Sequence, residues 1–115
     1  MIDMMREINT LLNQYVLNLK DIYGDSLRSV ILFGSYARGD YNGDSDIDIM
    51  ILLDISEMEV KRYGDSLSDM TYDFNVEHDL DIEPLVHTVA LFQKWEKNYP
   101  FFSNIKKEGV TLYAA

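Results

Sequence analysis

Two short segments of the sequence carry residue types that could bind and activate a phosphate group. The first is the turn Gly34-Ser35, followed one helical turn later by Arg38. A strand that ends in Gly-Ser and turns into a helix leaves backbone N–H groups free, and Gly lets a phosphate approach them closely. The Ser35 hydroxyl adds a donor, and the Arg38 guanidinium could supply a cation to the same phosphate.

The second segment is the acidic pair Asp46 and Asp48, at the start of a predicted strand. Residues two apart on a strand point to the same face, about 6–7 Å apart. Two carboxylates on one face repel each other and favour a divalent cation, and their hard oxygens suit Mg²⁺. Asp81 and Glu83 lie on the polar face of a third predicted strand, and either could bind a metal and accept a proton from an attacking hydroxyl. A phosphate-binding turn beside carboxylates is typical of metal-assisted phosphoryl or nucleotidyl transfer.

Hydrophobic periodicity predicts the elements that must position these residues. Apolar residues at steps of three and four predict helices, whereas short β-rich or alternating runs predict strands. We expect helices over 2–23 and 57–74, strands over 27–33, 46–53 and 79–87, and two short helices that start after Thr88 and at Pro100. Gly64 weakens the second helix without breaking its pattern, Pro84 places the later part of the third strand at an edge or a bulge, and 110–113 stays unassigned. This order predicts an α/β (α+β) domain with a small mixed β-sheet flanked by helices.

The composition limits the classes of function. The chain has 115 residues, of which 47% are hydrophobic, 10 are basic and 20 are acidic, with a net charge of −10 and no cysteine. This length suits a single domain over 1–115. The acidity argues against direct nucleic-acid binding, and the lack of cysteine excludes disulfides and thiolate zinc sites. The N-terminus does not resemble a signal peptide and no apolar run reaches ~18 residues, so we expect a soluble cytoplasmic protein without a membrane partner.

The two chemical segments together resemble a family signature. Gly34-Ser35, ten residues and then Asp46-x-Asp48 is similar to the signature of the DNA polymerase beta-type nucleotidyltransferase superfamily. The fuller motif, Gly34-Ser35-x-x-Arg38-Gly39 with Ser45-Asp46-Ile47-Asp48, resembles that of the superfamily's minimal branch, the minimal nucleotidyltransferase (MNT) domains. The resemblance is strong over 27–53 and extends weakly to Asp81 and to the tail 100–113.

The resemblance implies an enzyme with a nucleotidyltransferase fold that moves a nucleoside monophosphate, AMP from ATP, to a hydroxyl. It implies a two-metal Mg²⁺ site with catalytic and metal-binding roles for Asp46, Asp48 and a third carboxylate. We favour Asp81 over Glu83 for the third, because Asp81 is expected to lie deeper in its strand and Pro84 suggests that the strand then leaves the sheet. The residues implied to bind the nucleotide phosphates are Gly34, Ser35 and Arg38.

The resemblance also implies a partner. Most superfamily members carry a second, helical domain, for which we expect no room in 115 residues. Minimal members commonly pair with a HEPN-type helical protein in toxin–antitoxin modules, where the MNT domain resembles an enzyme that attaches AMP to a tyrosine of the toxin. A HEPN-type partner and a protein hydroxyl as acceptor are therefore expected. Two alternatives stay open: a non-catalytic antitoxin that acts by binding alone, and an antibiotic-type small-molecule adenylyltransferase, whose acceptor pocket a homo-oligomer would build.

Aromatic residues are dense near the C-terminus. We expect them to belong to the core or to a partner interface, because a chain this short has a small core. The residues concerned are Phe92, Trp95, Phe101 and Phe102.

Overall fold

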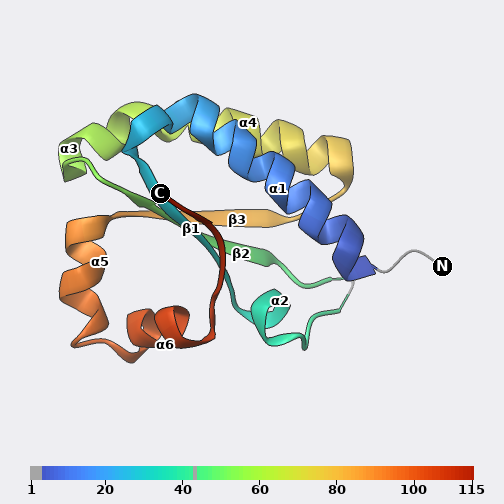
Figure 1. The fold of residues 1–115 in the computed structure, drawn as a ribbon. Helices are drawn as coiled ribbons and strands as arrows, with labels where there is room; N and C mark the ends of the chain where they lie inside the picture. The colour runs from blue at the N-terminus through green and yellow to red at the C-terminus, as the bar shows by residue number, and fades with distance from the viewer. Residues whose placement is uncertain (1–3, 43) are drawn as a thin grey trace.

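A four-stranded mixed sheet forms the centre of the protein in a computed structural model that describes residues 4–42 and 44–115 (Figure 1). The strands are β1 (Leu27–Phe33), β2 (Ile47–Leu53), β3 (Ile82–Thr88) and β4 (Val110–Ala114), in the order β3-β2-β1-β4. The helices are α1 (Met4–Tyr23), α2 (Ser35–Arg38), α3 (Glu57–Val60), α4 (Gly64–His78), α5 (Val89–Glu96) and α6 (Pro100–Glu108). Short 3₁₀ turns follow α1 and α3, at Gly24–Ser26 and Lys61–Tyr63.

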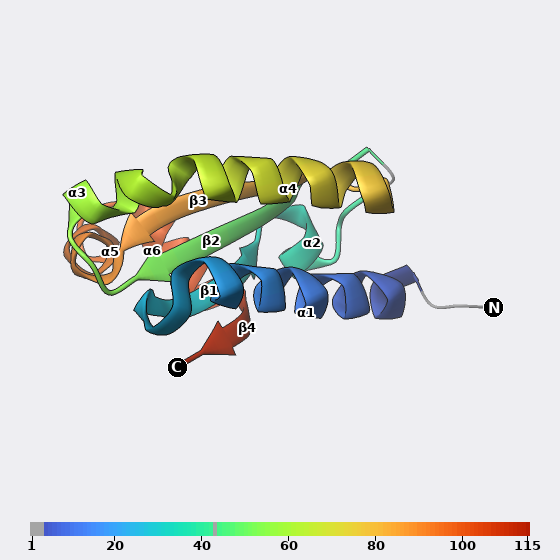
Figure 2. The ribbon, with the colours of Figure 1, turned by 90° about the horizontal axis from the view of Figure 1, so that it is seen from above.

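The sheet is mixed because β1 runs antiparallel to β2 and to β4, whereas β2 and β3 run parallel. A parallel pair needs a crossover connection, and α3 and α4 form it. α1 and α4 lie side by side over one face of the sheet, while α5 and α6 pack at the other (Figures 1 and 2). The predicted α+β class, with a small mixed sheet flanked by helices, is confirmed.

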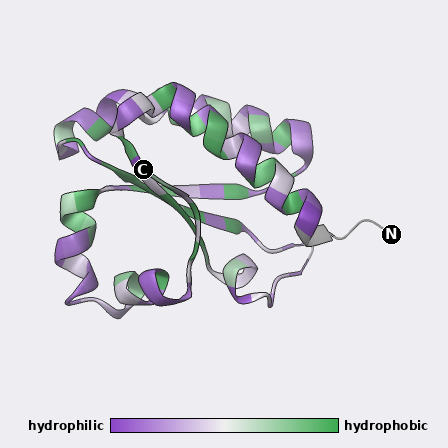
Figure 3. Cartoon of the chain, in the orientation of Figure 1, coloured by the Kyte–Doolittle hydropathy of each residue, from purple (hydrophilic) through white to green (hydrophobic). Residues whose placement is uncertain are grey.

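The central strand β2 is buried on both faces, so its residues alternate between two cores. The odd-numbered residues of 47–53 join the larger core with α1 and α4. Met50 and Leu52 face the other way and pack with Phe92 of α5 and Ile105 of α6. The strands at the centre of the molecule are accordingly hydrophobic, and the helices carry a hydrophilic outer side (Figure 3). This burial makes β2 a firm support for the acidic residues at its start.

The first helix confirms the predicted amphipathic stripe, although the predicted start at residue 2 lies outside the described residues. Ile8, Leu12, Tyr15 and Leu19 of α1 are all buried, at steps of three and four. The Tyr15 hydroxyl shares a hydrogen bond of 2.7 Å with Thr71 Oγ1 of α4. This buried bond joins the two helices that cover one face of the sheet.

The predicted helix over 57–74 is divided in the structure. Ser56 caps α3, because its Oγ accepts a hydrogen bond from the Glu59 N–H at 3.3 Å. The chain then tightens into the 3₁₀ turn Lys61–Tyr63, and Gly64 begins α4 instead of lying inside one continuous helix. Gly64 itself keeps helical dihedral angles, φ −56° and ψ −47°, and the backbone departs from the α-helix at Tyr63, with φ −97° and ψ −3°.

The third strand begins later than predicted, at Ile82 instead of residue 79. α4 continues to His78, and Asp79 takes a left-handed conformation with φ 53° that ends the helix. The prediction that Asp79 and Asp81 lie within the strand was therefore wrong, since the helix end and its turn occupy 79–81.

Pro84 lies on an edge strand, as predicted, but the strand does not leave the sheet there. Parallel pairing with β2 continues to Thr88. The Ile82 N–H faces the free edge of β3, where it donates to a side chain of α4. Pro84, two residues later, turns its nitrogen to the same edge, so its missing N–H removes no bond of the ladder.

The C-terminal segment agrees with the predicted short helices and adds a strand. Thr88 caps α5 by accepting from the Leu91 N–H at 3.1 Å, and Pro100 opens α6. The unassigned residues 110–113 form most of β4, which pairs with β1. Among the described residues, no helix is both long and apolar enough to cross a bilayer.

Candidate active site

The turn between β1 and α2 is shaped by Gly34. Its φ of 74° and ψ of −153° lie in a region that residues with side chains rarely adopt. A Cβ at this position would collide with the carboxylate of Asp48 on the neighbouring strand β2. Glycine therefore lets the turn lie directly against Asp48. α2 starts at Ser35, and the first N–H groups of a helix have no partner within it.

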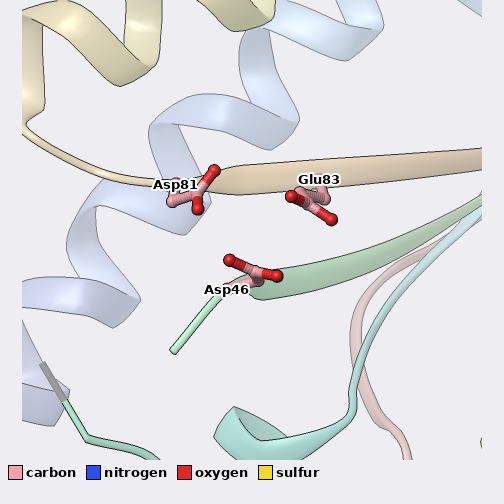
Figure 4. A group of neighbouring side chains, drawn as sticks. All are labelled: Asp46, Asp81 and Glu83. Carbon is pink, nitrogen blue, oxygen red and sulfur yellow. The ribbon is translucent and has the colours of Figure 1, made fainter. Parts of the chain in front are cut away.

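Three carboxylates meet where β2 and β3 begin. Asp46 immediately precedes β2, Asp81 immediately precedes β3, and Glu83 is the second residue of β3. The three side chains are exposed, and each offers an oxygen within 4.8 Å of the others (Figure 4). The strand register brings them together, because the Ile47 N–H donates to the Asp81 carbonyl at 2.8 Å and Ile47 pairs with Ile82. We call Asp46, Asp81 and Glu83 the carboxylate cluster.

Asp48 lies beside this cluster and closer to the turn. It pairs in register with Glu83 of β3, and its carboxylate is next to Gly34. The structure thus brings the predicted residues Asp46, Asp48 and Asp81 to one end of the sheet, and Glu83 with them. The predicted reason for favouring Asp81 was wrong, since Asp81 precedes β3 and Glu83 lies within it.

The carboxyl pKa values reflect this crowding of negative charge. Burial, and then the charge of Asp46, raises the pKa of Asp48, while Arg38 acts in the opposite direction. Hydrogen bonding to Asp46 is the main cause that raises the pKa of Asp81, followed by burial and the neighbouring carboxylates. The charge of Asp46 is the main cause that raises the pKa of Glu83. A divalent cation would relieve this repulsion, and a donor set of carboxylate oxygens fits Mg²⁺.

A cavity of about 580 Å³ joins the turn to the start of β2. Its lining includes Gly34, Ser35, Arg38, Asp46 and Asp48. Four residues of α6 form part of its lining: Phe101, Asn104, Ile105 and Glu108. A second cavity of about 420 Å³ is lined by Asp81 and shares Asp44 and Ser45 with the first. Two residues of the cluster therefore face these cavities, Asp46 the first and Asp81 the second.

Arg38 ends α2 and also lines the larger cavity. Its Nε lies 3.4 Å from Asp40 Oδ2, and both side chains are largely exposed. Exposed pairs of this kind contribute little to stability. A phosphate bound at the turn could therefore compete with Asp40 for the guanidinium.

Two features of the site were missed by the sequence analysis. The first is the α6 side of the cavity: the spacing of Phe101, Asn104 and Glu108 is visible in the sequence, but nothing there says what this helix side faces. Phe101 is 49% exposed and its ring meets Phe33 edge to face at 5.9 Å. The second is Asn75 of α4, which holds the start of β3 and belongs to no recognisable motif.

Comparison with known proteins decides the family. The sequence model of the nucleotidyltransferase domain matches residues 12–110, a range that includes the turn and the whole carboxylate cluster. The chain belongs to this family. It is therefore an enzyme of nucleotidyl transfer, and the resemblance inferred from the motifs is confirmed.

Relatives of this nucleotidyltransferase come from Methanocaldococcus jannaschii. "Putative protein adenylyltransferase MJ0604" is 35% identical over 102 residues, which cover 89% of this chain and 94% of that protein. "Putative protein adenylyltransferase MJ0141" is 33% identical over 81 residues, which cover 70% and 80%. A solved structure, described as "Crystal structure of the toxin-antitoxin with AMP-PNP", is 19% identical with a TM-score of 0.49 and covers 90% of this chain and 73% of that one. The structural likeness is too distant to carry an argument.

Proposed function

We propose that this nucleotidyltransferase moves AMP from ATP to a protein hydroxyl, and that the acceptor is a tyrosine of a HEPN-type helical partner. The observation that carries the proposal is the cavity in which the Gly34 turn and the acidic residues Asp46 and Asp48 meet. The names of the Methanocaldococcus jannaschii relatives support a protein as the acceptor. In this proposal residues 1–115 act as one nucleotidyltransferase domain.

The acidic end of the sheet fits a two-metal Mg²⁺ site. Asp46, Asp48 and Asp81 are the proposed ligands, with Glu83 close enough to take part. When bound, Mg²⁺ would neutralise charge on the phosphoryl oxygens and on the pyrophosphate leaving group. Neighbouring carboxylate charge is the first cause of the raised pKa of Glu83 and a further cause, after burial or hydrogen bonding, for Asp48 and Asp81; a cation would relieve this part.

Other groups of the chain are proposed to bind the triphosphate and to accept the proton of the acceptor hydroxyl. Ser35 and the free N–H groups of the turn hold the triphosphate, and Arg38 adds a cation. The acceptor oxygen attacks the α-phosphorus, the bond between that phosphorus and the bridging oxygen breaks, and pyrophosphate leaves. Asp81 is the proposed acceptor of the proton from the attacking hydroxyl, because a carboxylate placed beside the metals can act as a general base.

The surface beside the cavity supports a protein partner. Tyr99 and Phe101 at the start of α6 are 54% and 49% exposed, and Phe101 also lines the cavity. Exposed aromatic side chains are enriched in protein interfaces. A partner that covers them would bring its own tyrosine to the mouth of the site.

The experiment incubates the full chain with Mg²⁺, ATP labelled at the α-phosphate and the product of the adjacent gene. We expect label on a tyrosine of that protein and none from ATP labelled at the γ-phosphate, which leaves within pyrophosphate. Comparison of Asp81→Asn with Glu83→Gln assigns the third carboxylate. If Asp48→Asn still neutralises a toxic partner as well as wild type does, the chain acts by binding alone and the proposal fails.

A further inference from the structure

The side chain of Asn75, in the last turn of α4, holds the backbone at the start of β3. Its Oδ1 accepts from the Ile82 N–H at 2.9 Å, and its Nδ2 donates to the Ile82 carbonyl at 3.1 Å. Its main-chain carbonyl accepts from the N–H groups of Asp79 and Leu80. One residue therefore joins the end of α4 to the first residue of β3.

Ile82 needs this partner because β3 is an edge strand. The Asp81 carbonyl points inward and accepts from Ile47 of β2, so the N–H and carbonyl of Ile82 point outward. Within the described part of the chain, no strand pairs with that side of β3. The primary amide of Asn75 offers one donor and one acceptor side by side, so it takes the place of a peptide group from a neighbouring strand.

We call the two hydrogen bonds between the Asn75 side chain and the Ile82 backbone the clamp. The backbone that they hold connects Asp81 and Glu83 of the carboxylate cluster. The Asp81 carbonyl is held from β2, and both polar groups of Ile82 are held from α4, so the backbone between Asp81 and Glu83 is fixed from both edges. The Ile82 side chain is 2% exposed and belongs to the larger core. Movement of Asp81 or Glu83 away from Asp46 would break the clamp or expose this core residue.

Such movement has a driving force, because three carboxylates within 4.8 Å of one another repel. An edge strand such as β3 is paired with one neighbour only, so it can move more easily than the central strands β1 and β2. We infer that Asn75 is a positioning residue, which keeps Asp81 and Glu83 close enough to Asp46 to bind a divalent cation together. The inference rests on the metal-binding role proposed for the cluster.

The test compares Asn75→Ala with Thr71→Val in the full chain, with Mn²⁺ as the probe. Thr71 lies one helical turn earlier in α4, and its buried hydroxyl bonds to Tyr15 of α1 and not to β3. Asn75→Ala loses two hydrogen bonds to β3 and Thr71→Val loses one to α1, so both variants remove tertiary hydrogen bonds of the same helix. We expect the Mn²⁺ dissociation constant, measured by calorimetry, to rise about tenfold to a hundredfold in Asn75→Ala and to stay near wild type in Thr71→Val. Hydrogen exchange at the Ile82 amide should accelerate in Asn75→Ala, while circular dichroism confirms the fold.

Three results would overturn the inference. Equal Mn²⁺ affinity in Asn75→Ala and wild type would remove the positioning role and leave the proposed function standing. Equal loss of affinity in Asn75→Ala and Thr71→Val would assign the effect to general stability. Absence of Mn²⁺ binding by the wild-type chain at millimolar concentration would overturn the metal site and this inference together. Asn75→Ser supports the same comparison if the alanine variant does not fold.

Discussion

The two walls of the candidate site are built in different ways. The inner wall lies between β1 and β2, where the Asp48 carboxylate rests against Gly34 and the strands have neighbours on both sides. The outer wall lies at the edge strand β3, where Asp81 and Glu83 are exposed and Asn75 holds the backbone. Close packing shapes the first wall, whereas hydrogen bonds and charge shape the second.

This difference predicts which property each wall controls. A larger side chain in the inner wall must displace a neighbour, so stability and activity should fall together. Removal of a charge from the outer wall relieves repulsion, so activity should fall while stability does not. Asp46 lies between the walls, and its substitution is the most severe test of the comparison.

Replacement of Asp46 by Asn should have the largest effect on the reaction. The cluster loses the carboxylate that reaches both Asp81 and Glu83. We expect the rate of AMP transfer to fall roughly a thousandfold or more, which corresponds to ~4 kcal/mol of transition-state stabilisation. The rate is measured with α-labelled ATP at saturating Mg²⁺, and circular dichroism should match that of the wild-type chain.

The matched control is Asp69→Asn, which removes one exposed carboxylate from α4. Its rate should stay within a factor of about two of wild type, because exposed charges at a distance are screened by salt. An Asp46→Asn enzyme with full activity would contradict both the assignment of the cluster and the division into two walls.

Gly34→Ala should have the second largest effect, at the inner wall. Its φ and ψ belong almost exclusively to glycine, and the new Cβ would push the Asp48 carboxylate away. We expect a loss of about 1–3 kcal/mol in the free energy of unfolding by urea, together with a clear fall in the transfer rate.

Gly39→Ala separates backbone strain from collision. Gly39 also has a positive φ, 83°, but a Cβ there would meet no atom within 4 Å. This variant should lose about 1–2 kcal/mol of stability and keep its transfer rate. If both variants lose activity equally, contact with Asp48 is not what the glycine at position 34 provides.

The inner wall is also the part of the site that the sequence predicted well. The motif from Gly34 to Asp48 is local, and the two predicted strands around it were observed with nearly the expected bounds. Local signals suffice there because a buried strand, a glycine turn and a second buried strand leave the chain few alternatives.

The outer wall depends on tertiary contacts that no local sequence pattern predicts. The end of α4 shifted the start of β3 by three residues, since Asp79 entered a left-handed turn instead of a strand. The clamp at Ile82 comes from Asn75, whose amide could equally have faced water. Parallel pairing between β2 and β3 decides which carboxylates meet, and register between strands distant in the chain has no local signature.

The smallest expected effect concerns stability against pH at the outer wall. The pKa values of Asp81 and Glu83 are raised, and Asp46 is the first cause for both. A carboxyl with a raised pKa adds stability below its unfolded value and loses it as the pH rises through its folded value. Without metal, Asp46→Asn should therefore melt at a slightly higher temperature than wild type at pH 7, and the gap should close toward about pH 4. The gap is small because these groups are exposed.

His87, at the other end of β3, has a pKa lowered by burial. The fold therefore loses stability as His87 becomes protonated at lower pH, but this loss is equal in the wild type and in Asp46→Asn. A gap that persists at low pH, or a wild type that melts higher at pH 7, would mean that charge repulsion does not act on the edge strand.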